Sequence, residues 1–184
     1  MSRPATGPPS PQAAIRRCPS CGSGDVQSLA DRSVRCRKCS FVLFFSVVSA
    51  VAALIEDDIG RVLLVERGRD PQKGALDLPG GFVDYGESAE DAIVREVSEE
   101  LNLEIVRGSL RYLGSFPNTY EYLGVAYRTL DLAFTCTVET FSSQRFSDEI
   151  ASATFFFPRE IPFARVGFSS IQNILHAYVG GRGR

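Results

Sequence analysis

The chain has 184 residues, of which 44% are hydrophobic and 23% are charged, and its formal net charge is −2. This composition fits one ordinary globular domain with a small appendage. The slightly acidic balance excludes a chain-wide basic field for binding nucleic acid. No apolar run reaches the roughly 18 residues that span a bilayer, and the proline-rich N-terminus lacks an apolar signal core. We therefore expect a soluble, cytoplasmic protein with no membrane partner.

Composition divides the chain into three parts. Residues 1–17 contain MSRPATGPPSPQ, which is too rich in proline and small residues to pack, and we expect them to form a disordered tail. Residues 18–45 hold two cysteine pairs, and residues 46–184 hold strand and helix patterns that predict a mixed β-sheet between helices. The chain is therefore expected to form a tail, a small cysteine-rich module and one larger α/β domain.

The cysteine-rich module has the spacing Cys-x2-Cys-x14-Cys-x2-Cys, formed by Cys18, Cys21, Cys36 and Cys39. This spacing is close to that of a zinc ribbon, in which four thiolates bind one tetrahedral Zn²⁺. Two disulfides or a redox-active Cys-x-x-Cys are the alternatives, but a metal explains two matched pairs better. Because so short a segment cannot build a core of its own, we expect Zn²⁺ to be structural.

The segment after the module is strongly apolar. Residues 41–55 (FVLFFSVVSAVAALI) predict a buried strand or two joined strands. A turn at 57–60 follows, and residues 61–66 (RVLLVE) are predicted to return as the hairpin partner. After a polar loop at 67–75, a short strand at 76–78 leads into the sequence Pro-Gly-Gly.

Residues 81–103 (GFVDYGESAEDAIVREVSEELNL) predict an amphipathic helix with an acidic face. Glu96, Glu99 and Glu100 fall within one arc of roughly 100°, and like charges at such spacing destabilise an isolated helix. The cluster therefore suggests a cation, and oxygen ligands suit Mg²⁺; a solvated acidic face is the alternative. Ser88 can cap this helix. The apolar stripe that adjoins the acidic arc consists of Ala89, Ile93, Val97 and Leu101.

The same stretch resembles the Nudix box, Gly-x5-Glu-x7-Arg-Glu-aliphatic-x-Glu-Glu-x-Gly-aliphatic. The matching positions are Gly81, Glu87, Arg95, Glu96, Val97, Glu99, Glu100 and Leu103. Asn102 stands where the family usually has glycine, but asparagine is the next best residue for a left-handed helix C-cap. The resemblance implies a Nudix α/β/α sandwich with a mixed β-sheet for residues 46–184, preceded by the zinc ribbon.

The resemblance also implies the ligands of a divalent metal, Mg²⁺ or Mn²⁺. Glu96 and Glu100 are expected to bind the metal directly. Glu99 is expected to complete the cluster, either as a ligand or through a water bound to the metal. The carbonyl of Gly80, in the turn before the helix, matches a backbone ligand in several members of the family.

The resemblance also implies catalytic or supporting roles for three further residues. Glu87 and Arg95 are expected to form an ion pair that fixes the loop against the helix and orients the metal ligands. Members of the family use as general base either a glutamate of the box or one from a later loop. Glu149, which precedes the apolar run ATFFFP, is the candidate in the later loop.

The rest of the chain supplies strands and one more helix. The strands are predicted near 110–116, 127–138 and 153–158, and a closing helix is predicted at 169–178. Alternation along the second of these strands places Leu130, Leu132, Phe134, Cys136 and Val138 on one face. Cys136 is therefore expected to be a buried core thiol, and the single histidine, His176, is expected to be structural.

The substrate is the least determined feature. A zinc ribbon before a Nudix box resembles the NADH pyrophosphatase group, but residues 114–127 (GSFPNTYEYLGVAY) lack that group's motif Ser-Gln-Pro-Trp-Pro-Phe-Pro-x-Ser. Pro117 has the spacing seen in ADP-ribose pyrophosphatases, whereas Tyr120 has that of dinucleoside polyphosphate hydrolases. Phe116 and Tyr120 are candidates to stack on a nucleobase, and the alternative is that both rings belong to the core.

These observations predict a divalent-metal-dependent hydrolase of the diphosphate bond in a nucleoside diphosphate derivative, with an ADP-ribose-like small molecule favoured. An NADH or NAD pyrophosphatase is the first alternative. The second is an enzyme that acts on RNA 5′ ends, because basic residues outnumber acidic ones in the ribbon. A regulator that binds nucleotide without cleaving it is disfavoured by the intact box. The sequence leaves open whether the protein is a homodimer.

Overall fold

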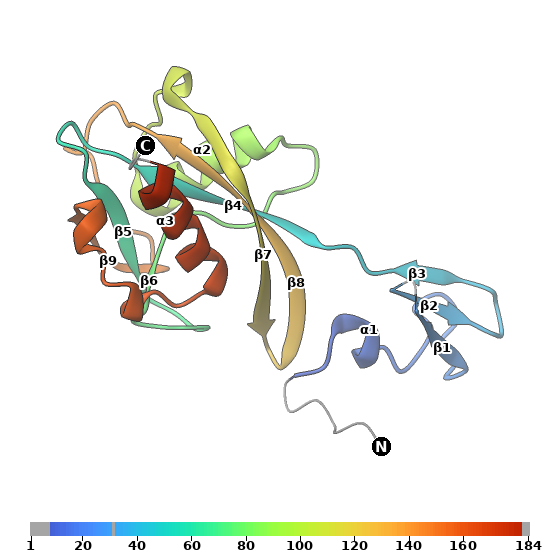
Figure 1. The fold of residues 1–184 in the computed structure, drawn as a ribbon. Coiled ribbons are helices and arrows are strands. Elements are labelled where there is room, and N and C mark those ends of the chain that lie inside the picture. The colour runs from blue at the N-terminus through green and yellow to red at the C-terminus, as the bar shows by residue number, and fades with distance from the viewer. Residues whose placement is uncertain (1–7, 31, 182–184) are drawn as a thin grey trace. The chain divides into compact units, whose positions relative to one another are not determined.

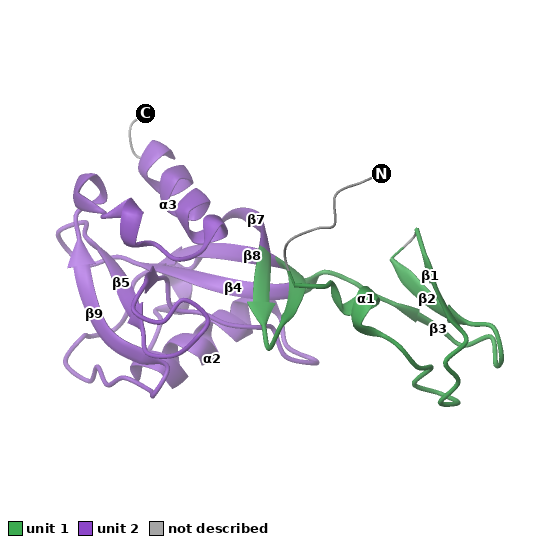
Figure 2. Ribbon diagram, turned by 90° about the horizontal axis from the view of Figure 1, so that it is seen from below, with its two compact units in different colours: residues 1–48, 119–129 green, residues 49–118, 130–184 purple. Residues whose placement is uncertain are grey.

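The computed structural model describes residues 8–30 and 32–181. The described chain divides into two compact units (Figure 2). Unit 1 contains the residues up to Val48 together with Thr119–Thr129. Unit 2 contains Ser49–Asn118 and the residues from Leu130 onward. The cysteine-rich module therefore lies in unit 1, and the acidic helix lies in unit 2.

Unit 1 is built around a three-stranded antiparallel sheet in the order β1-β2-β3 (Figure 1). Its strands are β1 (Val26–Leu29), β2 (Ser33–Cys36) and β3 (Val42–Phe44). Val34 and Cys36 on β2 are buried, whereas the ring of Phe44 is 64% exposed. So small a buried patch gives little stability by itself, and this sheet needs a further constraint such as a metal.

The segment expected to be a disordered tail contains a short helix, α1 (Pro11–Ala14). The Nε2 of Gln12 donates hydrogen bonds to the carbonyl oxygens of Leu29 and Ser33, at 2.8 and 2.9 Å. The structure therefore differs from the expectation here, because Gln12 satisfies backbone acceptors of β1 and β2. Residues 1–7 of the expected tail lie outside the described residues.

Two three-stranded sheets, in the orders β4-β8-β7 and β6-β5-β9, form the centre of the larger domain. The strands are β4 (Val48–Ile55), β5 (Val62–Arg67), β6 (Leu76–Asp77), β7 (Arg111–Tyr122), β8 (Val125–Cys136) and β9 (Ile150–Phe156). The α-helices are α2 (Ala89–Leu101) and α3 (Ser169–Gly181), and short 3-10 turns occur at Arg107–Ser109, Pro158–Glu160 and Phe163–Arg165. No described helix is long and apolar enough to cross a membrane.

Alternation along β4 and β5 builds the two apolar layers of unit 2. On one face, Val51 and Leu63 join a buried cluster with Ile93 and Val97 of α2. On the other face, Ala52, Leu54, Val62 and Leu64 join a second cluster with Ile171, Ile174 and Leu175 of α3. Figure 2 shows α2 and α3 on opposite sides of these strands. The predicted α/β/α sandwich is confirmed, and Cys136 is buried in the cluster on the α2 side.

The predicted hairpin between residues 41–55 and 61–66 is wrong. The first segment forms two strands, β3 and β4, and β4 pairs with β8, whereas β5 pairs with β6 and β9. A single bridge, between Glu56 and Val62, connects β4 and β5 directly. The turn between them is held by Asp57, whose carboxylate accepts hydrogen bonds from the backbone N–H and the Nε of Arg61, both at 2.7 Å. This turn passes the chain from one sheet to the other.

Candidate active site

The acidic helix α2 has defined ends. The N-cap is Ser88, whose Oγ accepts a hydrogen bond from the N–H of Asp91 at 3.1 Å and donates one to the Asp91 carboxylate at 2.8 Å. At the other end Asn102 adopts φ 53° and ψ 40°, the left-handed C-cap that its sequence position predicted. Ile93, Val97 and Leu101 are fully buried. Packing of this apolar stripe fixes the rotation of α2 and therefore the direction of its glutamates.

The turn formed by Gly80 and Gly81 lies in close contact with the acidic side of α2. A Cβ at Gly81 would lie 2.4 Å from the carboxylate oxygen of Glu96, and a Cβ at Gly80 would lie 2.0 Å from the carbonyl oxygen of Val51. Gly80 also has φ +151°, which side-chain-bearing residues rarely adopt. Its N–H donates a hydrogen bond to the carboxylate of Glu100 at 3.0 Å. Glycine is needed at position 80, and a side chain at position 81 would push the Glu96 carboxylate from its place.

Arg95 connects the glutamates of the box. Its Nη2 donates to Glu87 at 2.7 Å, and its Nη1 donates to Glu96 at 2.9 Å and to Glu99 at 3.1 Å. A further bond, from Nη2 to the carbonyl of Phe82 at 3.0 Å, ties the helix to the preceding loop. The hydrogen bond from Arg95 lowers the pKa of Glu87. The structure thus places Glu87 and Arg95 in the ion pair that the sequence suggested.

Glu100 and Glu96 sit in surroundings that disfavour their charged forms. Glu100 is 8% exposed, and burial raises its pKa to about 8, assisted by the negative charges of Glu96, Asp77 and Glu149. Burial also raises the pKa of Glu96, to which the charges of Glu99 and Glu149 add. One guanidinium offsets only part of this repulsion. A site of this kind favours a multivalent cation with hard oxygen ligands.

Glu149 directly precedes β9 and is close enough to influence the α2 glutamates by its charge. Its carboxylate pairs with the Nη2 of Arg69 at 2.5 Å. Its carbonyl accepts a hydrogen bond from the N–H of Gly68 at 2.7 Å. The sequence singled out Glu149 but missed Arg69, which had no motif to mark it.

A second buried pair was also missed. Arg67, at the end of β5, binds the carboxylate of Asp77 at 2.8 Å, and Asp77 is 7% exposed. The N–H of Leu78 donates to the same carboxylate at 2.8 Å. Burial raises the pKa of Asp77, while Arg67 opposes that shift. The sequence did contain a signal for this pair, because Asp77 lies inside the apolar segment LDLP and a buried carboxylate requires a partner.

The two aromatic candidates lie in different units. Phe116 belongs to unit 2, where it packs against the apolar cluster on the α3 side. Tyr120 belongs to unit 1, where its ring stacks on that of Tyr122 with centroids 6.3 Å apart. Phe116 is therefore packed partly into the core, as the alternative expected for both rings. A contact of either ring with the substrate stays a prediction. His176, on α3, stacks on Phe163 with centroids 4.2 Å apart, in line with a structural role.

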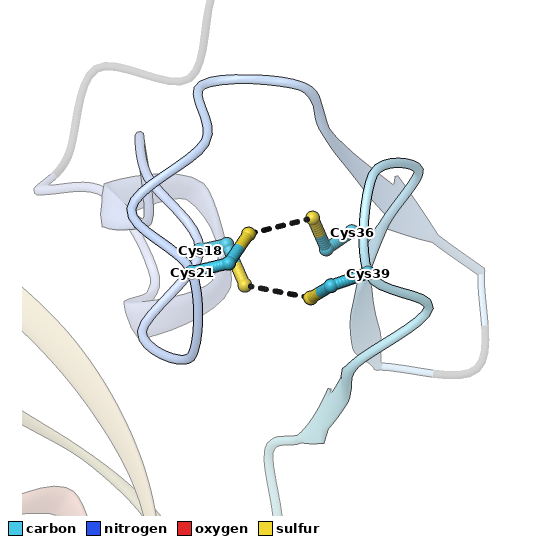
Figure 3. Close-up of side chains that lie close together, drawn as sticks. All are labelled: Cys18, Cys21, Cys36 and Cys39. Atoms are coloured by element: carbon cyan, nitrogen blue, oxygen red, sulfur yellow. Dashed lines mark hydrogen bonds between the residues drawn. The ribbon is translucent and has the colours of Figure 1, made fainter.

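The four cysteines of unit 1 converge (Figure 3). Their sulfur atoms all lie within 4.8 Å of one another, with 3.6 Å between Cys18 and Cys39 and 3.7 Å between Cys21 and Cys36. A tetrahedral ion with bonds of about 2.3 Å to sulfur needs edges of roughly 3.8 Å, so these thiols fit one. Among the described residues this is the only group of three or more potential ligands gathered so tightly, and all four thiols are free.

Two matching turns position the cysteine pairs. The N–H of Gly22 donates to the carbonyl of Cys18 at 2.9 Å, and the N–H of Ser40 donates to the carbonyl of Cys36 at 3.0 Å. Gly22 and Ser40 have φ +72° and +63° respectively. Each Cys-x-x-Cys segment therefore forms the same compact knuckle, with both thiols on its inner side.

Comparison with known proteins settles the family. The family model of the NUDIX domain matches residues 47–174. The chain belongs to the Nudix family. Among solved structures, a NUDIX hydrolase from Nitrosomonas europaea superposes with a TM-score of 0.70 at 21% identity, covering 92% of this chain and 93% of that one. A MutT NUDIX hydrolase from Burkholderia pseudomallei gives 0.57 at 27% identity, covering 72% and 98%.

Two curated relatives match different lengths of the chain. A protein of Methanocaldococcus jannaschii named ADP-ribose pyrophosphatase is 46% identical over 61 residues, 33% of this chain and 36% of that protein. A Pseudomonas putida protein named NAD-capped RNA hydrolase NudC is 28% identical over 171 residues, 91% of this chain and 57% of that protein. The second match is long enough to reach into the cysteine-rich module. The chain spans less than two thirds of either relative.

The raised pKa of Glu100 predicts how stability depends on pH when a chelator has removed metal from the Nudix domain. An acid whose pKa is higher in the folded state binds its proton more tightly there. Its contribution to stability is therefore full below the ordinary pKa of 4.5 and is lost as the pH rises through about 8. We expect the free energy of unfolding of the wild type to fall relative to that of Glu100→Gln across this range. Parallel profiles in urea unfolding would contradict the burial of Glu100.

Proposed function

We propose that the protein is a divalent-metal-dependent Nudix pyrophosphohydrolase that cleaves the diphosphate bond of a nucleoside diphosphate joined to another group. The observation that carries this proposal is the clustering of three glutamates on α2: Arg95 donates to Glu96 and Glu99, and the Gly80 N–H donates to the buried Glu100. A divalent cation would offset the repulsion among these carboxylates. An anionic diphosphate needs the same cation to offset its own charge.

In this proposal Glu96 and Glu100 bind the metal directly, Glu99 completes the ligand set, and the Gly80 carbonyl supplies a backbone oxygen. Carboxylate and carbonyl oxygens are the ligands of Mg²⁺ and Mn²⁺. When bound, the cation neutralises charge on the phosphates and makes water more acidic. The preformed hydrogen bond from Gly80 to Glu100 holds one carboxylate in place before any ligand arrives.

The remaining residues position groups and move a proton. Arg95 orients Glu96 and Glu99 through its hydrogen bonds, and Glu87 holds Arg95. Glu149 accepts the proton of the attacking water while a new P–O bond forms and the bridging P–O bond breaks. The products are a nucleoside monophosphate and the other moiety with its own phosphate.

An ADP-ribose-like substrate is favoured because the tryptophan-containing motif is missing and because the 46% identical relative is named an ADP-ribose pyrophosphatase. Stacking of the base on Phe116 or Tyr120 is part of this proposal. NAD-capped RNA is the second candidate. The observation in its favour is the NudC match, which extends into the cysteine-rich module.

A substrate panel tests the proposed function. We expect ADP-ribose to be cleaved with kcat/KM at least equal to that for NADH, giving AMP and a phosphorylated sugar by mass spectrometry. The panel contains ADP-ribose, NADH, an NAD-capped RNA oligonucleotide and a nucleoside triphosphate, each with Mg²⁺ or Mn²⁺. A clear preference for NADH or the capped RNA would contradict the favoured substrate. Cleavage of the triphosphate alone would contradict the substrate class.

Glu100→Gln tests the metal cluster. This change keeps the shape of the side chain but removes its charge and a hard oxygen ligand, so we expect kcat to fall on the order of 10²-fold or more. Thermal unfolding should show that the fold is retained. Glu90→Gln, at an exposed position in the first turn of α2, is the matched control and should keep wild-type turnover. Near-normal turnover of Glu100→Gln at saturating Mg²⁺ would contradict the assignment.

Elemental analysis tests the metal of the ribbon. Purified protein should hold about one Zn²⁺ per chain, because four thiols fit one tetrahedral ion. Removing the metal should unfold the ribbon, residues 18–45, while the apolar core of the Nudix domain keeps that domain folded. Amide exchange can follow the two parts separately. Cys39→Ser should lose the zinc, and Cys136→Ala, which alters the fifth cysteine, should retain it. Protein without zinc, or with disulfides under native conditions, would overturn this assignment.

A further inference from the structure

We propose that Arg69 is a positioning residue for the hydrolysis, which holds the carboxylate of Glu149 where it can accept the proton of the attacking water. The inference rests on the proposed function and adds a residue to it. Arg69 lies outside the Nudix box, in the polar loop that follows β5. An ion pair between its Nη2 and the carboxylate of Glu149, at 2.5 Å, links this loop to the segment before β9.

The pair has little to do with folding. The side chains of Arg69 and Glu149 are 62% and 42% exposed, and ion pairs at such positions contribute little to stability. A carboxylate that served only the core would be buried with its partner, as Asp77 is with Arg67. The position of this pair is therefore better explained by a role beside the glutamates of α2 than by a role in stabilising the core.

Backbone contacts hold the two residues at a fixed separation. Arg67 pairs with Ile150 at the end of the β5–β9 ladder, and the N–H of Gly68 donates to the carbonyl of Glu149 at 2.7 Å. A Cβ at Gly68 would lie 2.9 Å from the carbonyl oxygen of Asp148. The loop and the start of β9 therefore touch through their main chains, and Arg69 follows directly from this contact.

The same segment is bound to the C-terminal end of α2 on its other side. The N–H of Ser147 donates to the carbonyl of Glu100 at 2.9 Å, and the N–H of Arg145 donates to the carbonyl of Leu101 at 2.9 Å. The amide of Asn102 donates to the carbonyl of Ser143 at 2.7 Å. Residues 143–149 thus connect the metal-binding helix to the loop that carries Arg69.

Electrostatics explains why Glu149 needs a cationic partner. Its charge acts on both Glu96 and Glu100, so it faces a negative surface. Without an opposing charge, that surface would drive a half-exposed carboxylate toward solvent. Arg69 offsets this repulsion. Because the Nη2 of Arg69 contacts the Oε1 of Glu149, the inference assigns Oε2 as the oxygen that accepts the proton.

The test is a mutant cycle measured with ADP-ribose and Mg²⁺. We expect Glu149→Gln to lower kcat by about 10²-fold or more and Arg69→Met to lower kcat by at least about tenfold. The KM of Arg69→Met should stay within about twofold of the wild type, because ground-state binding is not what is lost. Arg69→Lys should restore part of kcat. The double variant should be no slower than Glu149→Gln, because Arg69 acts through Glu149.

Arg159→Met is the matched control, since Arg159 is 84% exposed and lies far along the chain in a 3-10 turn. It should keep wild-type kinetics, and thermal unfolding should show that every variant is folded. Unchanged kcat in Arg69→Met, a raised KM with normal kcat, or additive losses in the double variant would each overturn the inference. A wild type that cleaves no diphosphate would instead overturn the proposed function, and this inference with it.

Discussion

The close contact between the Gly80-Gly81 turn and the acidic side of α2 is the constraint on which the site depends. Glycine is required at position 80, where a side chain would collide with the backbone of Val51, and a side chain at position 81 would displace the carboxylate of Glu96. This contact removes water from two carboxylates and gives one of them a backbone hydrogen bond. Burial then makes negative charge costly at the place where several negative charges meet.

The apolar core provides the force that maintains this arrangement. Ile93, Val97 and Leu101 are fully buried against strands of unit 2, and each such side chain contributes about 1.5–3 kcal/mol. This packing offsets the repulsion among the glutamates of the adjoining acidic arc. Arg95 then donates hydrogen bonds to three carboxylates, those of Glu87, Glu96 and Glu99. The site is stable enough to exist and still negative enough to attract a cation.

Features that depend on neighbouring residues were predictable from the sequence. The N-cap at Ser88, the left-handed Asn102 and the paired cysteine knuckles each follow from a few consecutive residues. The pairing of β4 was not predictable in this way. Both β4 and β5 are apolar on both faces, so their patterns fit a hairpin as well as the observed sheets.

The contacts of Arg67 and Arg69 were also hidden from sequence analysis. Their partners are 10 and 80 residues away along the chain, and single arginines in a polar loop form no pattern. The same is true of Gln12, whose two acceptors are the carbonyls of Leu29 and Ser33, 17 and 21 residues away along the chain. Such residues become visible only when the fold brings distant segments together.

Because burial raises the pKa of Glu100, a proton and a metal cation compete for its carboxylate near neutral pH. Calorimetry of Mg²⁺ binding in two buffers of different ionisation enthalpy measures the protons released per cation. Because the pKa of Glu100 is raised to about 8, we expect the wild type to release a large fraction of one proton near neutral pH. Glu100→Gln should release much less. Metal binding to the wild type without any proton release would contradict this account of the site.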